Sequence, residues 1–134
     1  MQTCADEIAD ISLELPPEPE SVPRARSAVG ELADAAGADA RAVALAVSEA
    51  VGNAVMHAFR GRDGGTIVVR AETEGPALAV TVRDDGVGMT PDFESPGLGV
   101  GTALISRLAA DTQIRSSQDG TTVRMTFPIG ADAT

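Results

Sequence analysis

The 134-residue sequence has no lysine, tryptophan or tyrosine, three phenylalanines, one cysteine and one histidine. A single cysteine, Cys4, excludes an internal disulfide and agrees with a reducing cytoplasm. No apolar run approaches the ~20 residues of a membrane-spanning helix, and the N-terminal residues lack the apolar core of a signal peptide. These absences predict a cytoplasmic protein, and the length predicts one domain over residues 1–134.

The chain is strongly acidic. All ten basic residues are arginine, and twenty acidic residues bring the formal net charge to -10. Because aromatic side chains for base stacking are also scarce, the composition argues against nucleic-acid binding, which needs a basic surface to neutralise phosphates. An acidic surface favours a basic protein partner through electrostatic steering, although acidity alone also keeps a protein in solution.

Two helices are predicted after a short N-terminal strand. Alternating apolar side chains predict the strand at residues 11–15, and Pro16-Pro17 ends it. Ser21 is a suitable N-cap for the first helix, which is expected to stop near Gly37, and Asp39 is a suitable cap for the second. The second helix has an apolar stripe at helical spacing, formed by Val43, Val47, Ala50, Val51, Ala54 and Ala58.

Four strands and a third helix are predicted in the second half of the chain. The helix is expected at 101–110, and the strands at 67–71, 78–82, 113–117 and 121–127. Residues 86–100 are rich in Gly and Pro and predict a long loop, whereas Asp119-Gly120 predicts a hairpin turn. The order β-α-α-β-β-loop-α-β-β predicts an α+β fold, a two-layer α/β sandwich whose mixed, mostly antiparallel sheet carries its helices on one face.

Three polar residues lie along one side of the second helix at intervals of four residues: Glu49, Asn53 and His57. Each step turns only ~40° around the helix, so these side chains lie beside the apolar stripe, with small Ala42 and Ala46 leaving room for a ligand. A carboxylate, an amide and an imidazole offer a base, an oxygen ligand for Mg²⁺ and a donor to phosphate. The alternative is a solvated helix face with one histidine at its boundary.

Asp84 continues the buried face of the strand at 78–82, because it shares the parity of that strand's apolar residues. A buried carboxylate needs a hydrogen-bond donor, and the amino group of adenine is one. Gly86 and Gly88 follow and let the backbone approach a planar ring closely. An ordinary acidic turn, Asp-Asp-Gly, is the alternative interpretation.

The run Gly97-Leu98-Gly99-Val100-Gly101 leads into the predicted third helix. Glycines before a helix N-terminus expose amide N–H groups to phosphate, and the helix dipole assists. No strand directly precedes the run and the chain has no lysine, so this is neither a Rossmann nor a Walker A loop. Thr121 has the buried parity of the last strand and either shares a ligand with Asp84 or is an ordinary threonine at a strand start.

In this order the clusters resemble the motifs of the GHKL ATPase superfamily, which includes gyrase, Hsp90, histidine kinases and MutL. Ser48-Glu-Ala-Val-Gly-Asn-Ala-Val-Met-His57 resembles the N box, and Val82-Arg-Asp-Asp-Gly-Val-Gly-Met89 the G1 box. Gly97 to Ile105 resembles the G2 box and Gly120-Thr121 the last box, so the resemblance spans about residues 8–128. The short chain and its form of the N box are most similar to the RsbW-type anti-sigma-factor serine/threonine kinases.

The resemblance implies a Bergerat ATP-binding fold and a role for each matching residue. Glu49 would be the general base, Asn53 would chelate Mg²⁺, and His57 would lie near the phosphates of ATP. Asp84 would bind the adenine amino group, with Thr121 nearby. Further contacts with ATP would come from the adenine pocket and the lid, at Gly86, Gly88, Met89, Gly97, Leu98, Gly99, Val100 and Gly101.

For the whole protein, the resemblance implies an ATP- and Mg²⁺-dependent bacterial serine kinase that acts as an anti-sigma factor. Such a protein sequesters a sigma factor and phosphorylates an anti-anti-sigma (STAS-type) protein, and its relatives are often homodimers. Two alternatives stay open: a nucleotide-gated binding module without kinase activity, and an ATP-binding domain of the histidine-kinase type. Since His57 is the only histidine and lies in the pocket motif, the chain is not a complete histidine kinase.

Overall fold

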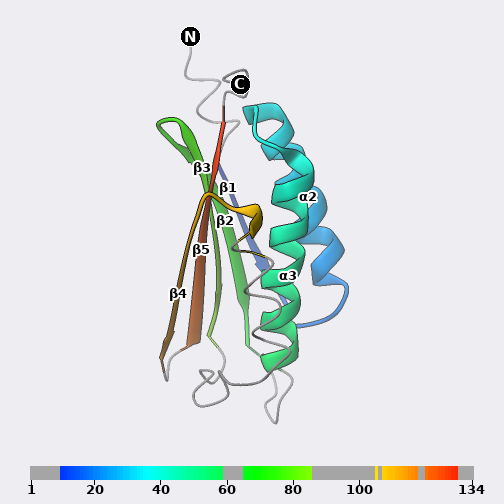
Figure 1. Cartoon of the computed structure of the whole chain (residues 1–134). Helices are drawn as coiled ribbons and strands as arrows, with labels where there is room; N and C mark the ends of the chain where they lie inside the picture. The colour runs from blue at the N-terminus through cyan, green and yellow to red at the C-terminus, as the bar shows by residue number, and fades with distance from the viewer. Residues whose placement is uncertain (1–9, 59–64, 86–104, 106, 118–119, 130–134) are drawn as a thin grey trace.

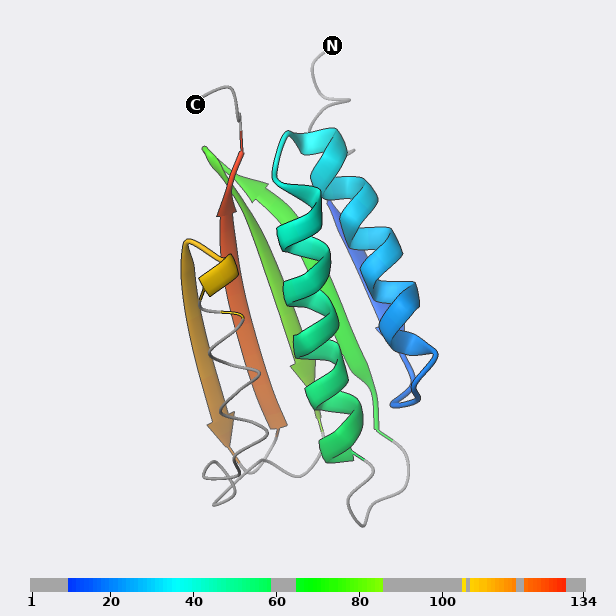
Figure 2. The same ribbon diagram turned by 45° about the vertical axis from the view of Figure 1, so that its right-hand side comes forward.

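The computed structural model of the chain describes residues 10–58, 65–85, 105, 107–117 and 120–129. Within them, five strands form one sheet in the order β1-β2-β3-β5-β4, and two long helices cover one face of this sheet (Figure 1). The elements in chain order are β1 Ile11–Leu15, α2 Ser21–Ala36, α3 Ala40–Ala58, β2 Ile67–Glu74, β3 Ala77–Asp84, β4 Asp111–Ser117 and β5 Gly120–Pro128. The predicted two-layer α+β fold is therefore confirmed, and Figure 2 shows both helices in front of the sheet.

The sheet is antiparallel in every pairing that the described strands make, which corrects the expectation of a mixed sheet. Only two residues separate β2 from β3 and β4 from β5, and so short a connection permits only antiparallel pairing. The chain reverses direction three times between β1 and β2: from β1 to α2, from α2 to α3 and from α3 to β2. β2 therefore runs antiparallel to β1. β3 also extends beyond its predicted end, and Asp84 becomes its last residue.

The start of α2 differs from the prediction. Ser21 is the first helical residue rather than the N-cap, a place taken by Glu20, which makes no side-chain capping bond. The side chain of Ser21 is buried and donates a 2.6 Å hydrogen bond to the carbonyl oxygen of Pro16. The proline-rich turn between β1 and α2 thus supplies an acceptor five residues earlier, and the hydroxyl binds this acceptor instead of a helix N–H.

The junction between the two helices agrees with the prediction. Gly37 has a φ of 89°, a left-handed conformation that glycine adopts without strain, and it ends α2. Asp39 then caps α3, because its carboxylate accepts 3.2 Å hydrogen bonds from the backbone N–H groups of Arg41 and Ala42. These two signals place α3 antiparallel to α2 and against β3.

The hydrophobic core lies between the helices and the covered face of the sheet. The strand residues that point to the helices are almost fully buried, among them Ile67, Val69, Ala71, Leu78, Val80, Val82, Met125 and Phe127. The predicted stripe of α3 is confirmed at Val43, Val47, Ala50, Val51 and Ala54, and Val55 is buried as well. Ala46 has an exposure of 0%, so it packs into the core and does not leave room for a ligand as expected.

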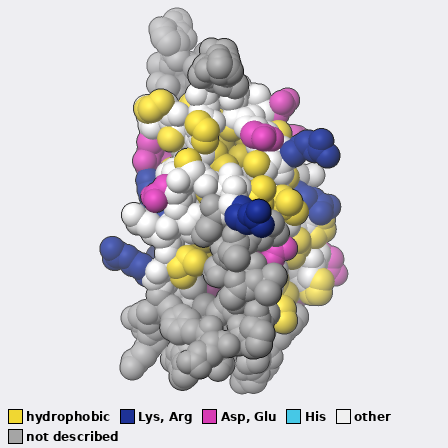
Figure 3. All heavy atoms as spheres, viewed as in Figure 1, with side chains coloured by type: hydrophobic (Ala, Val, Ile, Leu, Met, Phe, Trp, Pro, Cys, Tyr) yellow, Lys and Arg dark blue, Asp and Glu magenta, His cyan; other side chains and the backbone are white. Residues whose placement is uncertain are grey.

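The described surface carries mixed charge. In the view of Figure 3, acidic and basic side chains are scattered over the described atoms and do not gather into one large patch of a single sign. No helix in the described ranges is both long enough and apolar enough to cross a membrane.

Candidate functional site

Two buried polar residues lie opposite each other at one end of the sheet. Asp84, the last residue of β3, is the register partner of Thr121 on β5, and their exposures are only 9% and 7%. Directly opposed residues of an antiparallel pair have Cβ atoms ~5 Å apart and share one face of the sheet. Their face is the helix-covered one, because β3 buries Leu78, Val80 and Val82 on the same parity. The two residues can therefore contact the same small group.

Gly120 brings the backbones of β3 and β5 unusually close at this point. Its φ is 137°, which residues with a side chain rarely adopt, and a Cβ added there would overlap the carbonyl oxygen of Asp84. The same Cβ would also lie 3.0 Å from the Cα of Asp85. Glycine is therefore required before Thr121. The Gly120-Thr121 pair was noted in the sequence only for its resemblance to a motif, and this steric reason was not foreseen.

Asp85 has a different role from Asp84, and the sequence alone suggested no contact for it. Its carboxylate accepts a 2.9 Å hydrogen bond from the backbone N–H of Thr66, and its own N–H donates to the Thr66 carbonyl at 3.4 Å. Asp85 thus ties the end of β3 to the start of β2, while Asp84 turns to the covered face. The same alternation that placed Asp84 on the buried face predicts the opposite face for Asp85.

Glu49 and Asn53 lie on α3, one helical turn apart, and both are half-buried. They line a shallow depression of about 360 Å³ together with residues from the start of α2 and from α3 itself: Pro19, Val22, Ser48, Gly52, Val55 and Met56. The depression does not include Asp84 or Thr121. The structure thus groups the predicted residues into two pairs, one on the helix and one on the sheet.

Both pairs belong to the same end of the molecule. In Figure 1 and Figure 2 the C-terminal end of α3, the end of β3 and the start of β5 lie together at the lower end. Residues 86–104, which connect β3 to the described residues that follow, contain eight further predicted contacts: Gly86, Gly88, Met89, Gly97, Leu98, Gly99, Val100 and Gly101. These eight residues lie outside the described part of the chain, as does the side chain of His57, so their expected roles stay predictions.

The described side chains fit an adenine nucleotide with a divalent metal. The buried Asp84 carboxylate is an acceptor for an amino group, and the close approach at Gly120 shapes the backbone around it. Among the described residues no three His, Cys, Asp or Glu side chains cluster to hold a metal. Mg²⁺ commonly takes only one or two protein oxygens and completes its shell with phosphates and water, and the Asn53 side chain carries an oxygen of the kind that Mg²⁺ takes.

A protein-family model matches most of the chain. The model of the histidine kinase-like ATPase domain matches residues 15–127, which contain both pairs of candidate residues.

Curated relatives include two kinds of kinase. Serine-protein kinase RsbW of Listeria monocytogenes is 36% identical over 92 residues, which is 66% of this chain and 59% of the relative. Blue-light-activated histidine kinase 2 of Erythrobacter litoralis is 33% identical over 98 residues, 69% of this chain and 28% of the relative. Anti-sigma F factor of Bacillus velezensis is 31% identical over 94 residues, 60% of this chain and 63% of the relative. The chain thus spans less than two thirds of each of these relatives.

Solved structures resemble the fold. The RsbU and RsbW domains of a Mycobacterium tuberculosis protein align over 90% of this chain and 32% of that one, with a TM-score of 0.70 and 23% identity. The histidine kinase domain of an Erythrobacter litoralis blue-light-activated kinase aligns over 86% of this chain and 62% of that one, with a TM-score of 0.59 and 29% identity.

Proposed function

Because the chain belongs to the histidine kinase-like ATPase domain family, we propose that it binds ATP with Mg²⁺ and transfers the γ-phosphate to a serine of a partner protein. The family model covers most of the chain, and several of the curated relatives are called serine-protein kinase RsbW. Transfer to serine is the part of the proposal that goes beyond nucleotide binding.

The pairing of Asp84 with Thr121 on the covered face of the sheet is the observation that carries the proposal. A carboxylate oxygen accepts hydrogen bonds, and at 9% exposure the Asp84 side chain is shielded from most of the solvent. The exocyclic amino group of adenine supplies a donor, and the Thr121 hydroxyl, directly opposite, can donate or accept at the same ring edge. Guanine presents a carbonyl where adenine has its amino group, so this pair of residues favours ATP over GTP.

Glu49 and Asn53 are proposed to serve the transfer step. The serine oxygen attacks the γ-phosphorus, a new O–P bond forms, the bond from the γ-phosphorus to the bridging oxygen breaks, and ADP leaves with that bond's electron pair. Glu49 takes the proton from the serine hydroxyl. Asn53 holds the Mg²⁺, which neutralises phosphate charge when it is bound. Positioning and charge neutralisation account for most of the rate in such reactions.

The proposed protein partners follow from the names of the relatives. The name anti-sigma F factor supports a sigma factor that this chain sequesters in the cytoplasm. The name serine-protein kinase supports a protein that it phosphorylates, and we propose that this protein is of the anti-anti-sigma (STAS) type that the sequence resemblance implies. We include a homodimer as the proposed assembly. The acidic net charge of -10 adds support, because it steers basic surfaces of partners toward this chain.

The decisive experiment measures transfer of labelled γ-phosphate to a STAS-type protein encoded near this chain's gene, with ATP binding measured separately by calorimetry. Glu49→Gln should keep ATP binding and lose at least ~100-fold in transfer rate, because it removes the general base. Glu31→Gln is the matched control, since Glu31 is an exposed glutamate on α2, and its transfer rate should equal that of the wild type. If the wild type binds ATP and transfers no phosphate, the chain is a nucleotide-gated binding module instead.

A histidine-kinase type of ATP-binding domain is the second candidate, and the Erythrobacter relative favours it, at 33% identity over 69% of this chain. The same labelled product separates the two candidates. Phosphoserine survives acid treatment, whereas phosphohistidine is hydrolysed. Acid-stable label on the partner supports the serine kinase, and acid-labile label supports the histidine-kinase type.

A further inference from the structure

The face of the sheet opposite the helices carries four arginines on four adjacent strands. Arg70 on β2 and Arg124 on β5 both pair with Thr81 of β3, so they lie in one row across the sheet. In the next row, Arg83 on β3 and Arg115 on β4 both pair with Thr122 of β5, a pattern that repeats the first. Following the sheet order, the four arginines alternate between the two rows. We call Arg70, Arg83, Arg124 and Arg115 the arginine band.

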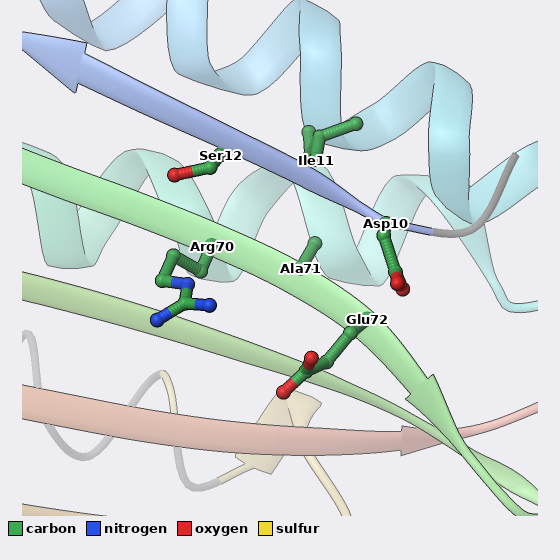
Figure 4. A pocket seen from close by; sticks show the side chains of 6 residues that line it. All are labelled: Asp10, Ile11, Ser12, Arg70, Ala71 and Glu72. Carbon is green, nitrogen blue, oxygen red and sulfur yellow. The ribbon is translucent and has the colours of Figure 1, made fainter. Parts of the chain in front are cut away.

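The band lies on the uncovered face and is accessible. Figure 4 shows the side chains of Arg70, Ser12 and Glu72 on one side of the sheet, while Ile11 and Ala71 point to the helices. Arg70, Arg83 and Arg115 are exposed, and the side chain of Arg124 keeps an exposure of 35%. Small or short side chains such as Thr81 and Thr122 separate the arginines, so the guanidinium groups stand above their surroundings.

Most of the band's charge is not neutralised within the described structure. Arg124 pairs with Glu74 at 2.7 Å, and this hydrogen bond raises the pKa of the Arg124 guanidinium. Within the described ranges, no carboxylate forms an ion pair with Arg70, Arg83 or Arg115. Four of the chain's ten basic residues thus gather on one face of a protein whose net charge is -10. Acidic residues also lie on this face, Glu14 on β1 and Glu74 on β2 among them, so the positive charge is confined to the band and favours a narrow ligand of opposite sign.

We propose that the arginine band is a docking surface for an acidic segment of another protein. From ideal sheet dimensions, successive arginines of the band are ~8 Å apart, one strand across and two residues along. Because the arginines alternate between the two rows, the band spans only ~14 Å across its four strands, which is about the distance from the first to the third of three carboxylates on alternate residues of an extended segment. Arginine binds a carboxylate through two parallel N–H···O bonds, which add geometric specificity as well as affinity.

The acidic border of the band argues for a narrow protein segment rather than a broad anionic surface. The row beyond Arg70 and Arg124 is occupied by acids on three strands, Asp10, Glu72 and Asp111. Figure 4 shows two of them, Asp10 and Glu72, beside a shallow depression of about 190 Å³ that Arg70 also lines. A membrane or a nucleic acid would set its phosphates against these acids. A short acidic segment contacts the band alone.

A second copy of the chain fits this face less well. The central residues of the face are charged, whereas the cores of dimer interfaces are depleted of charge.

Fluorescence anisotropy with a labelled peptide of alternating Glu and Ala, long enough to cross four strands, tests the proposal at low salt. The triple variant Arg70→Gln, Arg83→Gln, Arg115→Gln should weaken binding about tenfold or more, and salt should weaken the wild-type binding. The control variant Arg24→Gln, Arg26→Gln, Arg41→Gln changes the net charge equally at three exposed arginines of α2 and α3, and should leave binding within about twofold. A thermal unfolding curve and ATP binding, unchanged in both variants, show that the chain remains folded.

Three results would overturn the proposal. Equal weakening in the two triple variants would show that the peptide senses only the net charge. If anionic vesicles or duplex DNA bind more tightly than the peptide, and the band variant loses this binding, the ligand of the band is a phosphate surface and not an acidic protein segment. If sedimentation shows that the wild type self-associates and that only the band variant does not, the face binds a second copy of the chain.

Discussion

The close approach of Gly120 to Asp84 predicts that alanine substitutions at three glycines change the stability of the protein by different amounts. In urea unfolding, Gly120→Ala should lower the free energy of unfolding by ~3 kcal/mol. About 2 kcal/mol comes from forcing a side chain into a disfavoured backbone conformation, and ~1 kcal/mol from a disturbed strand hydrogen bond, because the added Cβ would overlap the Asp84 carbonyl. Gly120→Ala should also weaken ATP binding, because the backbone must move to accommodate the added Cβ and this movement displaces Asp84 and Thr121 relative to each other.

Two control glycines separate backbone strain from steric overlap. Gly75 has a φ of 60° with nothing within 4 Å of an added Cβ, so Gly75→Ala should cost only ~1 kcal/mol. Gly52 lies within α3, again with nothing within 4 Å, so Gly52→Ala should stabilise the protein by ~0.5–1 kcal/mol through helix propensity. If Gly120→Ala costs no more than Gly75→Ala, the close approach of β5 to β3 does not constrain this position and the reasoning is wrong.

Three further substitutions test single contacts. Asp84→Asn should weaken ATP binding by about 10–100-fold in calorimetry and reduce the preference for ATP over GTP, because a charge-assisted hydrogen bond contributes ~1.5–3 kcal/mol; equal ATP and GTP affinities in the wild type would refute the adenine assignment. Ser21→Ala should lower the free energy of unfolding by ~1 kcal/mol in urea, because it removes the hydrogen bond to Pro16, and no loss would mean that the buried hydroxyl contributes nothing. Glu74→Gln should change stability by less than ~0.5 kcal/mol, since its ion pair with Arg124 is partly exposed, and a larger loss in 1 M salt would contradict this.

Hydrophobic periodicity was sufficient to predict all the described strands and both long helices. Alternation at period two placed Leu78, Val80, Val82 and Asp84 on one face, and the structure buries all four. The cap at Asp39 was also readable, because its bonds join residues two and three positions apart. Local features of this kind depend on backbone geometry that neighbouring residues set by themselves, so a sequence is enough to predict them.

The sequence predicted which residues form the candidate site and which face of its element each one occupies. It did not predict how these residues lie relative to one another. The sequence placed Glu49 and Asn53 on one flank of a helix, and it placed Asp84 and Thr121 on buried strand faces. That β3 and β5 are neighbours, with Asp84 opposite Thr121, depends on the strand order, which no local pattern specifies. The expectation of room for a ligand beside Ala46 was wrong for the same reason, because packing against the sheet decides which small residues are covered.

The sequence by itself determined the elements, their order, the alternation of buried and exposed faces and the clusters that resemble a nucleotide site. Only the tertiary structure decided the antiparallel strand order, the hydrogen bond of Ser21 to Pro16 and the need for glycine at position 120. It also brought together the arginine band from residues as far apart as Arg70 and Arg124. The physical reason is that these features join groups distant in the chain, whose proximity is set by the packing of the whole core rather than by the conformation of any one segment.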